Sequence, residues 1–362
     1  MLKRAAALIF AGVSLIGWLS CGKNVSRFLY ASVPGADQIV AYREDPNSGI
    51  LTALTTSPTA AGPAVEAVAI HPSNKFLYAA NSAEADISLF TIASSGTITE
   101  VTPRTPVGNG VTTPTLLAMD PGGKFLYVGN IGANNPSISV FSIDASTGAL
   151  AAVAGSPFSI GISPLNMKLS PNGNVLYITA AGSPGYIEVW SVIAGVIQQP
   201  VVQVIQPNGN DPYGLAIDPS GAHLYTANTG SNSISEYSIS STDGSLTELT
   251  GSPIGETFSA PLALLVDSSG TYLYVANEGS SNLGAFSIGS DGSLTLLTNS
   301  PFGTSSHPNF IAQDPNGRFL FVGSETSPFA IQSFSLDPAS GTLTAIASYS
   351  LSSTPTSITL SQ

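Results

Sequence analysis

The sequence predicts an all-β fold, a seven-bladed β-propeller with four antiparallel strands per blade, from one repeated motif and the spacing of its copies. The motif is clearest as KFLYVGN at residues 124–130. It recurs around seven aromatic residues: Tyr30, Tyr78, Tyr127, Tyr177, Tyr225, Tyr274 and Phe321. These lie 48, 49, 50, 48, 49 and 47 residues apart. A nearly constant period of this size is typical of repeat architectures, which form one continuous body.

Four segments recur in each unit and account for the four strands of a blade. The first begins at a proline, runs apolar and ends in an Asp-Pro-x-Gly turn, as in PYGLAIDPSGA at residues 212–222. In such a turn Pro presets φ, Gly tolerates a positive φ and the Asp side chain caps the turn. The third segment mainly alternates between polar and apolar residues, as in SISVFSI at residues 137–143. The fourth follows a glycine turn, as in GSLTELTGSPI at residues 244–254. Short segments of this composition between turn clusters predict strands.

The second segment distinguishes a propeller from other all-β folds. One copy is LYVAN at residues 273–277, which is apolar on both faces instead of alternating. A strand of this kind has to be covered on both sides. Antiparallel four-stranded sheets achieve this when they stack face to face, and seven of them around an axis form a propeller with few exposed edges.

The two ends of the chain predict how the ring closes. The first unit starts directly at its second segment, at Arg27, and the last unit stops after a first segment, residues 355–361. We therefore expect residues 355–361 to form the innermost strand beside the N-terminal blade, residues 27–55, in a propeller that spans residues 27–362. Loop-closure entropy makes this seam the most costly contact of the predicted fold.

The N-terminal segment is typical of an exported protein. Residues 1–20 have the pattern of a secretory signal peptide, with an apolar run, Ala5–Leu19, that is shorter than the about 20 residues of a membrane-spanning helix. Cys21 follows at once, and the junction resembles the processing site of bacterial lipoproteins, in which the cysteine becomes lipidated. Residues 21–26 are then the lipidated cysteine and a tether, and the protein lies in the periplasm or at the cell surface. The alternative is ordinary secretory cleavage next to an incidental cysteine.

Composition and charge exclude several functions. Charged residues are only 9% of the chain and the net charge is −12, so the surface depends on Ser, Thr, Asn and Gly. An acidic chain without a basic patch repels phosphate backbones, which argues against nucleic-acid binding. Contact with a membrane is expected through the lipid anchor only, because acidic surfaces also avoid anionic lipids. With one cysteine there is no disulfide framework. We expect a monomer.

The combination of YVAN strands, SISVFSI strands, GSLT turns and SPF endings resembles the lactonase family of seven-bladed propellers over residues 27–362. That family includes bacterial 6-phosphogluconolactonase and the fungal carboxymuconate-lactonising enzyme. The repeats are also similar to the YVTN-type repeats of microbial surface proteins. The resemblance implies a seven-bladed fold and, as an activity, the hydrolysis of a sugar-type lactone.

The resemblance also implies catalytic residues. Active members of the family carry paired histidines or an Arg-His at certain strand openings and a glutamate after a YVVN-type strand. In this sequence YVANE at residues 274–278 places Glu278 at the glutamate position, and SHPN at residues 306–309 offers His307. The second histidine and the arginine are absent. A carboxylate or imidazole base activates water against a lactone carbonyl, and the oxyanion then needs a donor or cation.

A ring of polar residues is the predicted ligand site. In a propeller with this strand order, the loop before the first strand and the loop after the second share one face. The candidate ligand-binding residues on this face or lining the channel are Asn277, Asn309, Glu325, Asn228, Asn130, Asn81, Tyr213 and Lys168. Further polar residues expected on the face are Glu66, Glu84, Asn166 and Asp211. For each asparagine the alternative is a structural role in the turn after the strand. Lys168 is unusual in an apolar strand, and we expect it to line the channel or to reach its mouth, as an anion contact.

No cofactor is expected. Carboxylate and amide oxygens suit Ca²⁺ or Mg²⁺, but the sequence has no dense ligand motif for either ion. The three histidines and the single cysteine are too dispersed for a zinc site. His71 occupies a turn position that is Asp in other repeats, and His223 lies within a second strand, so we expect turn and packing roles for these two.

Two functions remain open at this point. One is an exported lactone hydrolase acting on a sugar-type lactone. The other is a non-catalytic propeller of the cell envelope that binds a glycan or an envelope protein on its polar face.

Overall fold

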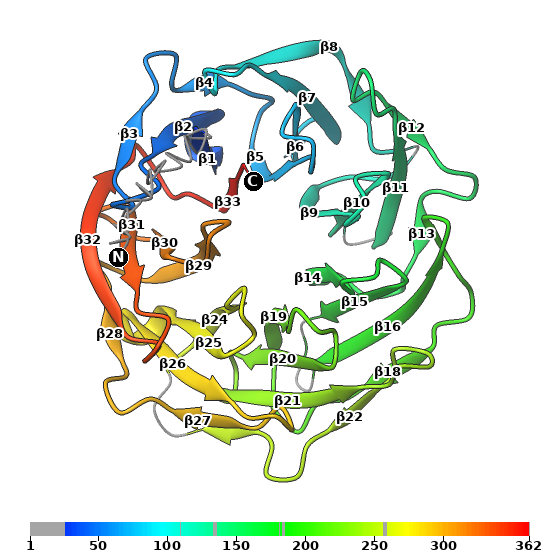
Figure 1. The fold of residues 1–362 in the computed structure, drawn as a ribbon. Helices are drawn as coiled ribbons and strands as arrows, with labels where there is room; N and C mark the ends of the chain where they lie inside the picture. The colour runs from blue at the N-terminus through cyan, green and yellow to red at the C-terminus, as the bar shows by residue number, and fades with distance from the viewer. Residues whose placement is uncertain are drawn as a thin grey trace, which may run out of the picture.

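A computed structural model shows seven antiparallel sheets arranged around a central axis, as the repeats predict (Figure 1). The structure describes residues 26–361 except 109, 133–135, 181, 183–184 and 256–258. The predicted signal peptide, Cys21 and nearly all of the tether lie outside the described residues. Among the described residues, none belongs to a helix with the length and hydropathy needed to span a bilayer.

The two inner strands of each blade follow the first and second segments of the repeat. The innermost strands are β5 (Val65–Ile70), β9 (Pro114–Met119), β14 (Pro164–Leu169), β19 (Pro212–Ile217), β24 (Pro261–Val266), β29 (Pro308–Gln313) and β33 (Ser357–Leu360). The second strands are β6 (Phe76–Asn81), β10 (Phe125–Asn130), β15 (Val175–Ala180), β20 (His223–Asn228), β25 (Tyr272–Asn277), β30 (Phe319–Ser324) and β1 (Arg27–Val33). Every residue of β6, β15, β25 and β30 is buried, which confirms that these strands are covered on both faces.

The two outer strands are less regular. The third strands are β2 (Gln38–Glu44), β7 (Asp86–Ile92), β11 (Ser137–Ile143), β16 (Tyr186–Ile193), β21 (Ser233–Ile239), β26 (Asn282–Ile288) and β31 (Ala330–Leu336). The fourth is continuous in two blades, as β8 (Ile98–Pro106) and β32 (Leu343–Ser350). In the other five blades it is broken into two pieces that both pair with the third strand. These pairs are β3 (Leu51–Ala53) with β4 (Thr59–Ala60), β12 (Leu150–Ala152) with β13 (Phe158–Ser159), β17 (Val196–Ile197) with β18 (Gln203–Ile205), β22 (Leu246–Glu248) with β23 (Ile254–Gly255), and β27 (Leu294–Leu296) with β28 (Phe302–Gly303). Two short 3-10 turns, η1 (Pro34–Ala36) and η2 (Glu278–Ser280), complete the elements.

The turn between the first and second strands has the predicted chemistry. In the blade of β24 and β25, which has Ser268 at the proline position of the motif, Oδ1 of Asp267 accepts hydrogen bonds from the backbone N–H groups of Thr271 at 2.8 Å and Tyr272 at 2.7 Å. Gly270 closes this turn with a φ of +72°, a left-handed conformation that favours glycine. The turn fixes the direction in which the second strand leaves the channel.

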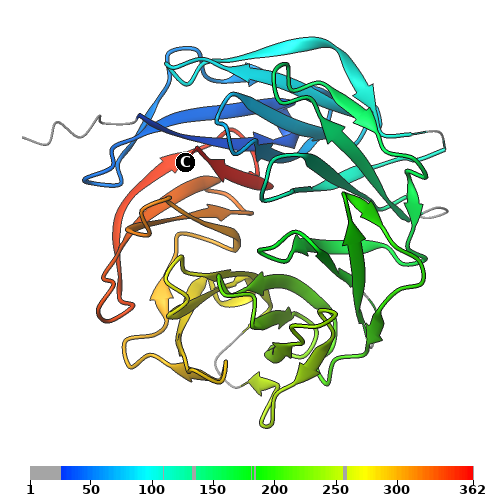
Figure 2. The same cartoon turned by 45° about the vertical axis from the view of Figure 1, so that its right-hand side comes forward.

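The ring closes as predicted. Strand β33 pairs with β1 in the register Leu29–Leu360, Tyr30–Thr359, Ala31–Ile358 and Ser32–Ser357. The C-terminal strand, drawn in red, therefore lies beside the N-terminal strand, drawn in blue, in both views (Figure 1, Figure 2). The seam buries Leu29 and Ala31 of the first blade against Phe319, Phe321 and Ile331 of the last.

The repeated aromatic residues join neighbouring blades through one hydrogen bond each. The hydroxyl of Tyr30 donates to the carbonyl of Gly96 at 2.7 Å, and that of Tyr78 donates to Gly148 at 2.8 Å. The same bond links Tyr127 to Gly195, Tyr177 to Gly244, Tyr225 to Gly292 and Tyr274 to Gly341. We call these six contacts the interblade tyrosine bonds. The seventh aromatic, Phe321 at the seam, has no hydroxyl to donate.

Candidate active site

Six side chains at the mouth of the channel are placed there by a β-bulge in the innermost strand of their blade. We call the side of the ring where these strands begin the opening face. In six blades the pairing with the second strand skips the residue after the first strand residue, which leaves it without a partner. The skipped residues are Glu66, Thr115, Leu165, Tyr213, Leu262 and Asn309, and all six line one cavity. Bulges re-aim side chains, so this local irregularity builds the site.

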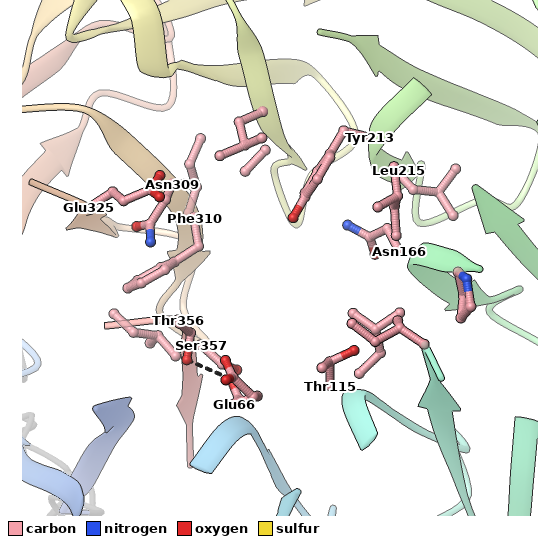
Figure 3. A pocket seen from close by; sticks show the side chains of 18 of the residues that line it. Glu66, Thr115, Asn166, Tyr213, Leu215, Asn309, Phe310, Glu325, Thr356 and Ser357 are labelled. Atoms are coloured by element: carbon pink, nitrogen blue, oxygen red, sulfur yellow. Dashed lines mark hydrogen bonds between the residues drawn. The ribbon is translucent and has the colours of Figure 1, made fainter. Parts of the chain in front are cut away.

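This cavity lies on the opening face and has a volume of about 590 Å³. Polar residues that include Asn166, Tyr213, Asn309 and Glu325 line it together with leucines and isoleucines of the innermost strands. In Figure 3 the Tyr213 hydroxyl points into the cavity, with Asn166 on one side and Asn309 and Glu325 on the other. A concave site with an apolar wall and a few convergent polar groups is typical of small-molecule binding.

Three ionisable side chains of the cavity influence one another. Burial raises the pKa of Tyr213, and the carboxylates of Glu325, Glu278 and Glu66 raise it further. Burial also raises the pKa of Glu325, with a contribution from Glu278, while His307 lowers it. The pKa of Glu66 is raised by burial, against a hydrogen bond from Ser82 that lowers it. Tyr213 therefore stays a protonated donor, and Glu325 is a stronger base than a free carboxylate.

The predicted pair Glu278 and His307 lies next to this cavity, although neither residue is among those that line it. Glu278 begins η2, and its backbone N–H donates to the carbonyl of Ala260 at 3.0 Å. His307 precedes β29, and its Nδ1 lies 2.8 Å from the hydroxyl of Thr326. The backbone N–H of Glu325 donates to the carbonyl of His307 at 2.8 Å, and the charges of Glu278 and His307 both contribute to the pKa of Glu325.

Four of the predicted ligand asparagines lie in the interior of the blades. Asn81, Asn130, Asn228 and Asn277 are fully buried and are not among the cavity residues. Their side-chain amides donate to the loop or strand that follows: Asn81 to Asp86 at 2.7 Å, Asn130 to Ser139 at 3.0 Å, Asn228 to Ser235 at 2.9 Å and Asn277 to Asn282 at 2.8 Å. The structure places them away from the cavity because each amide joins the second strand to the third strand of its own blade. This is the structural role given above as the alternative to ligand binding.

Other residues reach the cavity that the sequence analysis did not single out. They are Thr115, Phe310, Thr356 and Ser357. The hydroxyl of Thr356 donates to the carbonyl of Glu66 at 2.6 Å and ties the closing strand to the next blade (Figure 3). The signal that could have found Thr115 and Thr356 is their position directly after an opening proline, which they share with Tyr213 and Asn309.

An arginine, Arg104, lies at the opening face, although the arginine of the family motif is absent. Arg104 of β8 bonds the carboxylate of Glu84 at 2.7 Å and that of Glu100 at 2.7 Å. Two carboxylates hold this guanidinium on an outermost strand, so it does not line the cavity. No cluster of three or more His, Cys, Asp or Glu side chains suited to a metal ion exists in the described part of the chain.

The other two histidines have the roles that the sequence indicates. His71 is buried in the turn after β5, where its Nδ1 lies 2.8 Å from the Ser73 hydroxyl and its Nε2 lies 2.8 Å from the Gly123 carbonyl of the next blade. His223 lies at the start of β20, with its Nδ1 3.3 Å from Asp218 and its ring against Gly292 of the next blade. Both side chains join blades and lie outside the candidate active site.

With this fold and cavity in place, the family can be stated. The chain belongs to the family of lactonase seven-bladed propellers: the family profile described as "Lactonase, 7-bladed beta-propeller" matches residues 23–115, 112–192, 164–259, 200–302 and 253–360. A 6-phosphogluconolactonase of Formosa agariphila is 42% identical over 60 residues, which are 17% of this chain and 17% of that protein. The chain thus matches less than a fifth of the length of this relative.

Solved structures share the fold at low sequence identity. A protein of Bacteroides fragilis, described as a candidate 6-phosphogluconolactonase, has a TM-score of 0.78 at 19% identity, over 94% of this chain and 99% of that chain. The periplasmic gluconolactonase of Pseudomonas aeruginosa has a TM-score of 0.77 at 19% identity, over 93% of this chain and 99% of that chain. At these identities the likeness shows the propeller architecture.

Proposed function

We propose that this protein is an exported lactone hydrolase that opens a sugar-type lactone in the cavity of the opening face. One observation carries the proposal: in a lactonase-family propeller, a protonated phenol, Tyr213, and a carboxylate of raised pKa, Glu325, face the same cavity. Glu278 and His307, at the positions that the family pattern marks, lie beside Glu325. These are the groups that ester hydrolysis by an activated water requires.

The geometry assigns each group a step. A carboxylate of the cluster, with Glu325 the member that faces the cavity, accepts a proton from water while the water oxygen bonds to the lactone carbonyl carbon. The Tyr213 hydroxyl donates a hydrogen bond to the oxyanion that forms. The ring C–O bond then breaks, and the proton held by the carboxylate passes to the leaving alkoxide. His307 and Glu278 adjust the basicity of Glu325 through their charges.

The charge of the cavity favours an unphosphorylated lactone. Among the described residues that line it, the only cationic side chain is Lys168, and Glu66 and Glu325 are acidic. A phosphate group is usually bound by Arg or by several cations. The proposed substrate is therefore closer to that of a gluconolactonase than to that of a 6-phosphogluconolactonase.

Export supports the same choice of substrate. We propose that residues 1–20 direct secretion and that a lipid on Cys21 anchors a monomer to the membrane. The similar protein of Pseudomonas aeruginosa is described as a periplasmic gluconolactonase, which supports export. An exported enzyme meets free sugar lactones rather than phosphorylated metabolites of the cytoplasm.

A screen of lactone hydrolysis tests the proposal. Proton release is followed with unphosphorylated and phosphorylated aldonolactones, and each rate is corrected for spontaneous hydrolysis. We expect turnover of at least one unphosphorylated sugar lactone and a much lower kcat/KM for its phosphorylated counterpart. Absence of turnover on every lactone would contradict the proposal.

A second function is favoured by a specific observation. The carboxylates of Glu278 and Glu325 make no hydrogen bond to another described residue, so nothing in that part of the chain orients them as a catalytic relay would. An unoriented polar mouth that contains Tyr213 and Phe310 also suits a non-catalytic propeller that binds a glycan or an envelope protein. Inactivity on all lactones combined with specific binding on a glycan array would support this function.

A further inference from the structure

Lys168 lies between two cavities of the central channel. It lines the cavity of the opening face and also a second cavity, of about 600 Å³, that opens toward the other side of the ring. The two cavities share Lys168, Ile311 and Ile358, so the lysine lies at the waist where they meet. Among the described residues that line either cavity, its ammonium is the only positive charge.

The register of the blades shows why a long side chain fits at this point. Lys168 pairs with Tyr177, the repeated aromatic of its blade. The residues that pair with the corresponding aromatics of the other six blades are Ala69, Ala118, Ala216, Leu265, Ala312 and Thr359. Four of these six are alanines. Lys168 is thus the one charged side chain among the seven residues at this level of the innermost strands, where most of the equivalent side chains are small.

The ammonium has no counter-charge. Lys168 makes no hydrogen bond or ion pair with another described residue, although its side chain is accessible from the channel. Surrounding protein limits its hydration and lowers its pKa, with no carboxylate acting in the opposite direction. A cation whose hydration is limited and that has no counter-charge attracts an anion more strongly than a fully hydrated surface lysine does.

We infer that Lys168 forms an anion subsite at the waist of the channel and that this subsite takes the carboxylate of a sugar acid. A carboxylate fits better than a phosphate because one ammonium balances one negative charge, whereas a phosphate dianion would retain a charge in a cavity whose mouth carries Glu66 and Glu325. Thr359, which lines the second cavity together with Lys168, adds a hydroxyl donor for the second carboxylate oxygen or for a sugar hydroxyl.

The inference rests on the proposed function and narrows its substrate. A lactone whose far end carries a carboxylate would place that end on Lys168 and its carbonyl near Tyr213 and Glu325 at the mouth. The substrate class is then an acidic sugar lactone, derived from a uronic or aldaric acid. A neutral sugar lactone of the same size lacks the group that Lys168 recognises.

Direct binding tests the subsite without any need for catalysis. The two probes are methyl β-D-glucuronoside and methyl β-D-glucoside, which differ only in that the first has a carboxylate where the second has a hydroxymethyl group. Both are titrated at millimolar concentration by calorimetry or ligand-observed NMR. We expect the wild-type protein to bind the glucuronoside at least about tenfold more tightly than the glucoside. Lys168→Met should abolish this preference and Lys168→Arg should retain it. Lys75→Met, which removes an exposed lysine from the turn after β5, should leave it unchanged.

Each outcome bears on the inference. Equal binding of the two probes, absence of glucuronoside binding, or a preference that survives Lys168→Met would overturn it. Tighter binding of inorganic phosphate than of the glucuronoside would overturn the choice of carboxylate. The proposed function fails separately: if Lys168 controls carboxylate binding but no lactone is hydrolysed, the subsite stands and the hydrolase does not.

Discussion

At the scale of single residues, one bulge position decides which side chains can take part in chemistry. In six blades the residue after the first residue of the innermost strand turns into the cavity, as Tyr213 and Asn309 do. The asparagine that ends a second strand turns into its own blade, as Asn228 does, and is unavailable. Substitutions at bulge positions should therefore change ligand binding, whereas substitutions at the terminal asparagines should change stability.

Glu44 carries a prediction about the pH dependence of stability. It is 1% exposed, and neither carboxylate oxygen has a hydrogen-bond partner in the described part of the chain. Burial raises the pKa of Glu44 to about 7, the nearby Asp314 and Asp45 raise it, and Arg27 opposes them. The folded state thus holds this proton more tightly than the unfolded state, in which the pKa is 4.5.

The sign of the effect follows from linkage. The contribution of Glu44 to stability is largest below about pH 4.5, falls as the pH rises to about 7, and is then constant. Its span is at most about 3 kcal/mol. Glu44→Gln stays neutral, so we expect it to flatten the stability profile in this window and to raise the urea midpoint at pH 8. If the free energy of unfolding of the variant changes with pH between pH 5 and pH 7 as steeply as that of the wild type, Glu44 is not the group that causes this pH dependence.

Sequence reasoning reached only part of the site, for a physical reason. Tyr213, Asn309, Glu325 and Lys168 were found because a propeller of known strand order fixes which loops and strands meet at the channel. The burial of Asn130 was not found, because the direction of a side chain at a strand end depends on a local hydrogen bond, here to Ser139, that no periodicity encodes.

At the scale of elements, the interblade tyrosine bonds connect one sheet to the next. The acceptor glycine lies in the turn between the third and fourth strands, and a positive φ such as +74° at Gly148 suits glycine there. A side chain at Gly148 would also collide with Phe76 of the preceding blade. The repeat in the sequence predicted the aromatic and the glycine separately, but their contact needed the stacking of blades.

Removing one of these hydroxyls should destabilise the fold. Tyr78→Phe leaves the buried carbonyl of Gly148 without its donor, which costs about 1 kcal/mol. We expect a lower urea midpoint with an unchanged slope. A midpoint equal to that of the wild type would mean that the hydroxyl adds nothing to blade stacking.

The seam offers the opposite substitution. Gly49 packs on Phe319 as Gly96 packs on Phe28, so the carbonyl of Gly49 corresponds to the other interblade acceptors, and Phe321 has no hydroxyl to donate to it. Phe321→Tyr should add the missing interblade bond and raise the free energy of unfolding by about 1 kcal/mol, so the urea midpoint rises. A lower midpoint would instead indicate that the last blade has no room for the hydroxyl.

At the scale of the whole molecule, closure depends on a short strand. Strand β33 provides the innermost strand of the first blade, and Arg27 adds an ion pair of 3.0 Å to Asp314 across the same seam. Deleting residues 355–362 removes the strand and exposes both the apolar seam and the backbone groups of β1. We expect aggregation or a thermal midpoint at least about 5 °C lower. A truncated chain with the wild-type midpoint would contradict closure by this strand.

The proposed lactone hydrolysis takes place at the mouth of the cavity, with Glu325 as the base. The most direct measurement is the initial rate of sugar-lactone opening by the wild type, by Glu325→Gln and by Glu84→Gln, which alters an exposed glutamate of the same face that is paired with Arg104 outside the cavity. We predict a loss of about a hundredfold or more in kcat for Glu325→Gln and no change for Glu84→Gln. Equal rates for all three proteins would contradict the account.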